Sequence, residues 1–168
     1  AIVGSLAILV IALVAHRLFY SPLLTGLASL LMALDGLALV HSRTALLDNF
    51  LAFFTLVATY FFIIRKYQWS GVFLGLAVAT KWSALYFIAL FGLIALYRAF
   101  THHTGRDIIK PTFKRVLAFG IIPSLIYITS WVGWFISDRG WDRFYSKNVM
   151  SSFIYYHQQM WNFHVGLT

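Results

Sequence analysis

Apolar residues along this chain gather into long, nearly unbroken runs that are separated by short basic or polar segments. Most of these runs approach the ~20 residues that one α-helix needs to cross the hydrocarbon core of a bilayer. The predicted spans are residues 1–15, 22–41, 45–64, 70–80 followed by 83–97, and 116–136. The pattern therefore predicts an all-α fold in which residues 1–143 form a polytopic transmembrane helical bundle.

Charges at the ends of the runs indicate how the helices cross the membrane. The linker 98–115 carries five Lys or Arg and one Asp, and Arg17 and residues 65–66 are also basic. Basic loops favour the cytoplasmic side, and all three can lie there only if residues 71–96 cross the membrane twice. We therefore expect two short helices with a turn near Lys81, because a charge at membrane depth is costly unless it faces a cavity or an interface.

This topology places the remaining run ends on the outer side of the membrane. Arg43, Asp48 and Lys81 lie there, followed by the charged residues between Asp138 and Lys147. We therefore expect the functional site at the extracytoplasmic face. A cysteine at position 137 should be reachable from outside the cell, and one at position 104 should not.

Residues 144–168 differ from the spans because they mix aromatic and polar side chains. Tyr and Trp favour the boundary between hydrocarbon and water. We expect an extracytoplasmic helix that lies on the membrane surface, truncated at its end. One face of this helix should carry Phe153, His157, Met160, Trp161 and His164.

Composition agrees with a membrane protein and excludes other classes. The 168 residues are 61% apolar and 11% charged, whereas soluble domains are about a quarter charged, and the apolar content also excludes disorder. The chain has no cysteine, its five acids are all aspartate, and its formal net charge is +8. In a membrane protein this excess indicates cytoplasmic loops, anionic lipid head groups or a phosphate-bearing substrate rather than nucleic acid.

Arg43 and Lys81 are the first candidates for binding an anion. An arginine grips a phosphate with paired donors, and a lysine adds a point charge. Structural alternatives remain open: Arg43 could form an ion pair with Asp48 at a helix start, and Lys81 could extend to the interface beside Trp82. Asp35 could be a buried acid bonded to a neighbouring helix or to Arg43.

The histidines give weaker signals. His157 and His164 lie seven residues apart, but two histidines without a nearby carboxylate are a weak metal signal, and no metal is expected. His102 and His103 are expected to be solvated. The sequence has no glycine-rich phosphate loop and no arrangement typical of a serine hydrolase or a zinc site.

Several motifs occur in an order that is typical of one family. Residues 34–50 contain Ser-Arg-x-x-Leu-Leu-Asp at 42–48. Further motifs are Ala-Thr-Lys-Trp-Ser-Ala-Leu at 79–85, Trp-Val-Gly-Trp-Phe at 131–135, and Tyr-His-Gln-Gln-Met at 156–160, which leads to Phe163 and His164. Over most of its length the chain resembles the protein O-mannosyltransferases, which are dolichyl- or polyprenyl-phosphate-mannose–protein mannosyltransferases, in a bacterial, actinobacterial-type form.

The resemblance implies a membrane glycosyltransferase of the GT-C type in the bacterial cell membrane, with its site on the extracytoplasmic face. Such an enzyme transfers mannose from polyprenyl-phosphate mannose to Ser or Thr hydroxyls of secreted or membrane proteins, with the secretion machinery as a further partner. The lipid-linked donor is a substrate, and no cofactor is expected. The implied residues are Arg43, Asp48, Lys81 and Trp82 for the donor and its phosphate, and His157 and His164 for acceptor or donor contacts.

One family feature has no counterpart in the chain. The family's acidic pair precedes this region, and a chain without glutamate cannot contain an Asp-Glu motif. We therefore expect an internal fragment, truncated on both sides, whose catalytic base is unknown and lies upstream. Alone, this fragment should be inactive.

Two other functions remain as alternatives. One is another GT-C transferase that uses a lipid-phosphate sugar, such as an aminoarabinose or arabinose transferase. The other is a transporter whose broken helix at Lys81 binds an anion within the membrane. A transporter should show a second broken helix in an inverted repeat, whereas a transferase should not require one.

Overall fold

The computed structural model describes residues 2–44, 46–102 and 105–166, and every regular element in these ranges is a helix. The all-α class is therefore confirmed. Residue 45, where the third span was predicted to begin, lies outside the described residues, as do His103, residue 104 and residues 167–168. The helices are α1 (Ile2–Phe19), α2 (Pro22–Leu34), α3 (Gly36–Thr44), α4 (Leu47–Ile63), α5 (Tyr67–Thr80), η1 (Trp82–Ala84), α6 (Leu85–His102), η2 (Gly105–Ile108), α7 (Ile109–Val116), the π-helical η3 (Leu117–Ile121), α8 (Ile122–Ser130), α9 (Val132–Ile136) and α10 (Val149–Val165).

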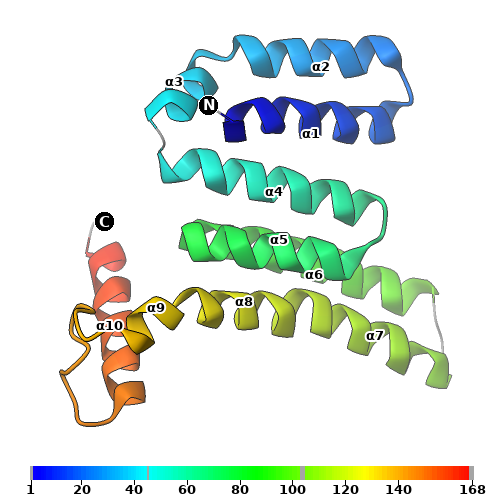
Figure 1. The fold of residues 1–168 in the computed structure, drawn as a ribbon. Helices are drawn as coiled ribbons and strands as arrows, with labels where there is room; N and C mark the ends of the chain where they lie inside the picture. The colour runs from blue at the N-terminus through cyan, green and yellow to red at the C-terminus, as the bar shows by residue number, and fades with distance from the viewer. Residues whose placement is uncertain (1, 45, 103–104, 167–168) are drawn as a thin grey trace. The chain divides into compact units, whose positions relative to one another are not determined.

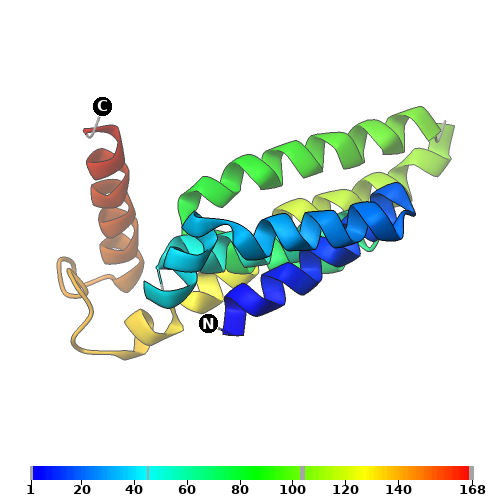
Figure 2. The same cartoon turned by 90° about the horizontal axis from the view of Figure 1, so that it is seen from above.

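The chain divides into a first unit, Ala1–Tyr127, and a second unit, Ile128–Thr168. In the first unit the long helices run alternately in opposite directions, as both ribbon views show (Figure 1, Figure 2). The turn after α1, the α4–α5 turn, the end of α6 and the start of α7 consequently lie at one end of the unit. The end of α2, the start of α4 and the α5–α6 break lie at the other end.

Three stretches in the described residues are long and apolar enough to cross a membrane: Ile2–Phe19, Trp82–His102 and Gly105–Ser130. The shorter helices α2 and α4 are also apolar. Large apolar side chains point outward from several of these helices; Leu23, for example, is 79% exposed. An outward apolar surface of this kind suits lipid and would be unfavourable in water.

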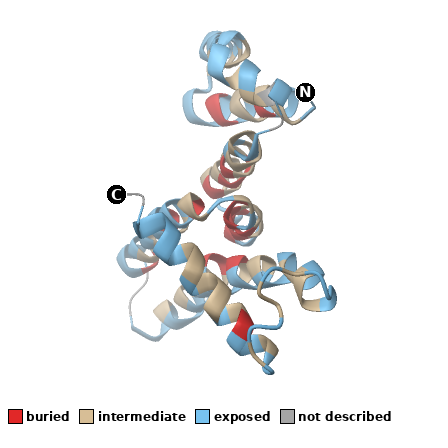
Figure 3. Cartoon of the chain, turned by 90° about the vertical axis from the view of Figure 1, so that its left-hand side faces the viewer, coloured by how far each residue is buried: buried red, intermediate tan, exposed pale blue. Residues whose placement is uncertain are grey.

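The core of the first unit lies where α4, α5, α6 and η3 meet. Phe62 of α4 stacks on Phe91 of α6, with ring centroids 4.5 Å apart, and lies edge-on to Phe119 of η3 at 6.0 Å. Tyr67 of α5 completes this aromatic cluster. Figure 3 shows buried residues where helices face one another and exposed residues on their outer sides.

Close packing of α5 depends on two glycines that the sequence analysis did not single out. A Cβ at Gly71 would lie 1.8 Å from the backbone oxygen of Ala118, and one at Gly75 would lie 3.0 Å from the Cα of Pro123. Small residues four apart let helix backbones approach closely in membranes. Here they seat α5 against η3 and α8.

The predicted span 22–41 is wrong as a single helix, because the structure breaks it at Asp35. The carboxylate of Asp35 accepts hydrogen bonds from the backbone N–H groups of Leu37 and Ala38, at 3.2 and 3.3 Å. This is the geometry by which an aspartate caps a helix N-terminus. Helix α2 therefore ends at Leu34, and α3 begins at Gly36.

Other boundaries also differ from the prediction. Helix α1 continues to Phe19 rather than ending at residue 15. The span predicted at 116–136 begins earlier, because helical structure continues from α7 through η3 into α8, and α8 ends at Ser130 before the short α9. The stretch 71–96 does consist of two helices, α5 and α6, which meet at Lys81 as the charge pattern predicts.

The second unit contains α9 and α10, joined by an irregular loop. Its aromatic side chains pack together: Phe153 of α10 lies 5.4 Å from Trp131 and 5.0 Å from Phe135, measured between ring centroids. The Arg143 guanidinium lies 5.4 Å from the Trp134 ring and donates to the Phe135 carbonyl at 3.1 Å. Helix α10 occupies the segment that the sequence assigned to the membrane surface.

Candidate functional site

The break between α5 and α6 holds an ion pair that joins two of the predicted site residues. Lys81 has an extended backbone, with φ −156° and ψ 134°, so the helical path is interrupted there. Its ammonium group donates to Asp48 Oδ1 at 2.8 Å, and the two side chains are 50% and 45% exposed. Lys81 and Asp48, predicted separately as site residues, are thus brought together.

Helix direction explains this contact. Helices α4 and α5 run antiparallel (Figure 1), so the first turn of α4, with Asp48, lies beside the last residues of α5. A carboxylate near a helix N-terminus is stabilised by the helix dipole. The ion pair therefore fixes Lys81 at the end of the unit that the charge pattern assigns to the outside.

Trp82 follows Lys81 in the break and is anchored from the other side. Its indole N–H donates to the hydroxyl of Tyr127 in α8 at 3.0 Å, and the side chain is half-buried. This contact joins the break to the third apolar stretch. The residue that follows Lys81 is therefore tied to α8.

Arg43 lies in the last turn of α3 and is exposed. In the described part of the chain, the one ion pair between a Lys or Arg and an aspartate joins Lys81 to Asp48, so Arg43 has no carboxylate partner there. The helix-start pair between Arg43 and Asp48 is therefore not formed. The suggestion that Asp35 is a buried acid is wrong too, because Asp35 is exposed and caps α3.

His157 and His164 lie on α10 in the second unit. Each places Nδ1 close to the carbonyl oxygen four residues earlier, at 2.8 Å from Phe153 and 2.6 Å from Met160. The His157 ring also lies 4.9 Å from that of Trp131. His157 lines a shallow apolar groove of about 290 Å³ with Phe153 and Trp161. The role of His157 and His164 in acceptor or donor binding stays a prediction.

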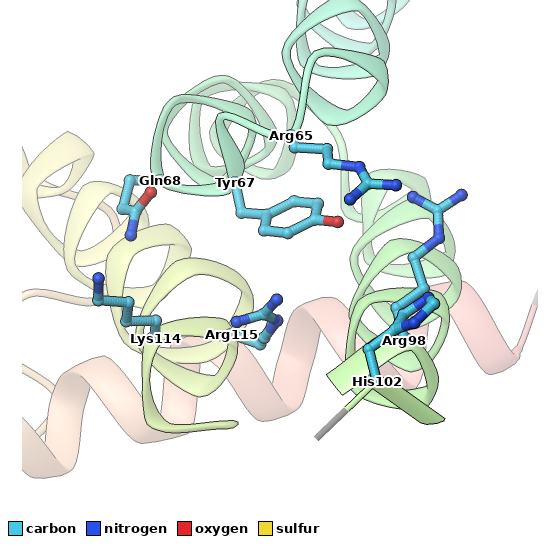
Figure 4. Close-up of a pocket in the computed structure, with 7 residues that line it drawn as sticks. All are labelled: Arg65, Tyr67, Gln68, Arg98, His102, Lys114 and Arg115. Carbon is cyan, nitrogen blue, oxygen red and sulfur yellow. The ribbon is translucent and has the colours of Figure 1, made fainter. Parts of the chain in front are cut away.

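At the opposite end of the first unit, basic side chains share a pocket that the sequence analysis did not identify. Arg65, Arg98, Lys114 and Arg115 line it from the α4–α5 turn, α6 and α7 (Figure 4). The sequence reveals each of these cations, and their positions indicate how the helices are oriented across the membrane. It does not reveal that residues 65, 98 and 115 meet, because their convergence depends on how the helices pack.

Comparison with known proteins gives consistent matches. A family model described as dolichyl-phosphate-mannose-protein mannosyltransferase matches residues 1–135. A Corynebacterium glutamicum protein named polyprenol-phosphate-mannose–protein mannosyltransferase is 31% identical over 224 residues, covering 100% of this chain and 42% of the relative. A Mycolicibacterium smegmatis protein of the same name is 31% identical, and the match covers 86% of this chain and 35% of the relative. A Mycobacterium tuberculosis protein of that name is 28% identical, and the match covers 100% of this chain and 42% of the relative.

The chain spans about two fifths of the length of these relatives. No solved structure matches the chain significantly.

Proposed function

The chain belongs to the dolichyl-phosphate-mannose–protein mannosyltransferase family, and from this membership we propose that it forms part of a membrane enzyme that glycosylates proteins. The donor is mannose on a polyprenyl phosphate, and the acceptors are Ser or Thr hydroxyls of secreted or membrane proteins. The fold is the helical membrane fold of the GT-C type that the family implies. Family membership favours this transferase over the aminoarabinose, arabinose and transporter alternatives.

The contrast between the two ends of the first unit supports a multi-pass topology with the site outside. One end gathers Arg17, the α4–α5 turn with Arg65, and the α6–α7 connection, all of them basic. The other end carries the Lys81–Asp48 pair and the exposed Arg43. Basic loops favour the cytoplasm, so Lys81 and Arg43 face the extracytoplasmic side, where secreted acceptors are found.

The observation that carries the proposed role of this end is the helix break at Lys81, held by Asp48 on one side and by Trp82 on the other. A half-exposed cation fixed at a break is suited to receiving a phosphate oxygen. When the glycosidic bond breaks, negative charge accumulates on the departing lipid phosphate. Lys81 and Arg43 would stabilise that charge as it develops, as oriented donors do in acyl and phosphoryl transfer.

The two cations are proposed to contribute differently. Lys81 forms an ion pair with Asp48, whereas Arg43 is exposed and has no carboxylate partner in the described residues. An arginine can also offer paired donors to a phosphate. The acidic pair that provides the base in the family has no counterpart in the chain. Activation of the acceptor hydroxyl is therefore assigned to residues outside this sequence.

Mannosyl transfer by the intact protein tests the proposal directly. The assay supplies polyprenyl-phosphate mannose and a Ser/Thr peptide to purified enzyme in lipid nanodiscs. Arg43→Ala should lower turnover per folded molecule by about 10²–10³, the usual effect of losing one donor to a developing anion. Arg43→Lys should also be impaired, because charge alone does not replace the paired donors.

Arg139→Ala is the matched control, since Arg139 is also exposed, is also predicted from the charge pattern to be extracytoplasmic, and has no proposed role. It should turn over normally. No transfer by the intact wild-type protein would refute the mannosyltransferase assignment. Normal turnover of Arg43→Ala would refute the role of Arg43 alone.

The role of Lys81 can be separated from its structural pairing with Asp48. Lys81→Met leaves the Asp48 carboxylate without its partner, and the double variant Lys81→Met with Asp48→Asn removes both charges. If Lys81 serves only to balance Asp48, the double variant should recover turnover that the single variant lost. If Lys81 binds the phosphate, both variants should stay slow.

Labelling with an impermeant thiol reagent on intact cells tests the topology. The chain has no cysteine of its own. Ser137→Cys should be labelled from outside, and Thr104→Cys should be labelled only after the cells are opened. The reverse pattern would move Arg43 and Lys81 to the cytoplasm and end the proposed assignment of this site.

A further inference from the structure

The basic pocket at the other end of the first unit has a defined shape and lining. It is a cavity of about 340 Å³, bordered by Arg65, Tyr67, Gln68, Arg98, His102, Lys114 and Arg115. The residues come from the α4–α5 turn, α5, α6 and α7. Figure 4 shows the guanidinium groups of Arg65 and Arg98 turned toward each other near the Tyr67 hydroxyl, with Arg115 below the Tyr67 ring.

No carboxylate among the described residues forms an ion pair with the basic side chains of this pocket. The pocket is lined by four Lys or Arg side chains and no carboxylate. The ion pair between Lys81 and Asp48 is the one contact of a Lys or Arg with an aspartate in the described residues, and it lies in the break between α5 and α6. Like charges that share one cavity repel each other. An anion bound between these cations would attract each of them and offset the repulsion.

Two of the arginines are held in place by aromatic rings. The guanidinium carbon of Arg98 lies 5.4 Å from the centre of the Phe62 ring, and that of Arg115 lies 5.3 Å from the centre of the Tyr67 ring. Arg115 also donates from Nη1 to the Pro111 carbonyl at 2.8 Å. Stacking of this kind orients a guanidinium without using up all its donors.

Two further features point to a site rather than to a solvated basic surface. The Nε atom of Arg115 is buried and has no hydrogen-bond partner, although buried donors are usually paired. Arg65 has φ +61°, a left-handed conformation that a residue with a side chain rarely adopts and that costs free energy. The tight α4–α5 turn thus presents an arginine where a glycine would fit more easily.

The exposed side chains of helix α7 favour a position for this pocket near the lipid head groups. Ile109, Phe113 and Val116 recur at helical spacing and are 66%, 61% and 46% exposed. Lys114 and Arg115, between them in the sequence, line the pocket instead. An amphipathic helix with an exposed apolar stripe and basic side chains beside it is typical of the membrane interface. A lipid phosphate is therefore within reach of the pocket.

We propose that this pocket binds the phosphate of an anionic phospholipid in the leaflet opposite the proposed mannosyl-transfer site. Basic pockets between membrane helices bind phospholipid head groups, and paired arginine donors match phosphate oxygens. The bound lipid joins the α4–α5 turn to α6 and α7 by neutralising the charges that they bring together. The proposal requires that the helices cross a bilayer but does not depend on mannosyl transfer.

Native mass spectrometry of the intact protein tests this inference, with phosphatidylglycerol in detergent as the probe and phosphatidylcholine as the neutral competitor. Wild-type protein should retain phosphatidylglycerol in preference to phosphatidylcholine. The pair Arg98→Gln and Arg115→Gln should weaken this retention at least about tenfold, since two charge-assisted contacts are lost.

The matched control removes two charges from the same end without touching the pocket. Lys66 precedes α5 and Lys110 lies on α7; both are exposed, and neither lines the cavity. Lys66→Gln with Lys110→Gln should retain the lipid as the wild type does. Equal losses in the two pairs would show only a general basic surface and would overturn the proposal.

Two further measurements separate the remaining outcomes. If the glutamine pair does not fold, Arg98→Lys with Arg115→Lys keeps the charge and should still bind phosphatidylglycerol more weakly than wild type, because the paired donors are gone. Wild-type retention by this lysine pair would overturn the proposal. Inorganic phosphate that displaced the lipid at equal concentration would show a site for soluble phosphate and would overturn the assignment to a lipid.

Discussion

Substitution of Gly71 by alanine should destabilise the protein strongly, because the helix contact leaves no room for a methyl group. The added Cβ would lie 1.8 Å from the Ala118 oxygen and 2.8 Å from its carbonyl carbon. Helix α5 cannot move away easily, because Ser70, which precedes Gly71 in the same helix, is fully buried and donates to the Ala58 carbonyl of α4 at 2.9 Å. The clash must therefore push α5 and η3 apart.

The expected magnitude follows from two opposing effects. Overpacking a close contact costs about 1–3 kcal/mol, and a contact with backbone belongs at the upper end. The higher helix propensity of alanine stabilises the helix by about 1 kcal/mol relative to glycine and offsets part of this cost. The net loss for Gly71→Ala should thus be about 2 kcal/mol. Gly75→Ala, whose Cβ would lie 2.8 Å from the Cβ of Ile126 and 3.0 Å from the Cα of Pro123, should lose less because the overlap is smaller than at Gly71.

Gly26→Ala is the matched control. Gly26 lies inside α2, and a Cβ there would have no neighbour within 4 Å. Alanine should therefore stabilise the protein by about 0.5–1 kcal/mol. Unfolding of the intact protein in mixed detergent and SDS micelles would measure all three variants. The order Gly26→Ala, wild type, Gly75→Ala, Gly71→Ala is expected from most to least stable, and a Gly71→Ala protein as stable as Gly26→Ala would refute the close contact.

Three further predictions concern single hydrogen bonds, each measured in the same unfolding assay. Tyr127→Phe removes the acceptor of the Trp82 indole and should cost about 1 kcal/mol, while an unchanged midpoint would show that the bond does not help hold the α5–α6 break. Ser70→Ala should cost about 1 kcal/mol by leaving the buried Ala58 carbonyl without this donor, and a stabilised variant would contradict that role. Asp35→Ala should cost about 1 kcal/mol by uncapping α3, whereas Asp35→Asn should retain most of the stability.

Much of the helix pattern could be predicted from the sequence. Lys81 is an example, because its charge in the middle of an apolar stretch requires either a break or a cavity. The structure has the break at that residue. Asp35 shows where this reasoning fails, because its place inside an apolar run suggested a buried acid bonded to a neighbouring helix or to Arg43. The carboxylate instead caps a new helix. Hydrogen bonds from nearby backbone N–H groups to an aspartate side chain compete with continuation of the helix, and the length of an apolar run does not reveal this.

The sequence by itself determined the helical class, the positions of the apolar stretches and the family, since these depend on composition, run length and the order of motifs. Only the tertiary structure decided which charged residues meet. Asp48 pairs with Lys81 rather than with Arg43 because α4 and α5 are antiparallel neighbours. Arg98 and Arg115 converge because aromatic rings on α4 and α5 hold them across one cavity. Such partners are set by packing between helices, and no spacing along a single chain encodes them.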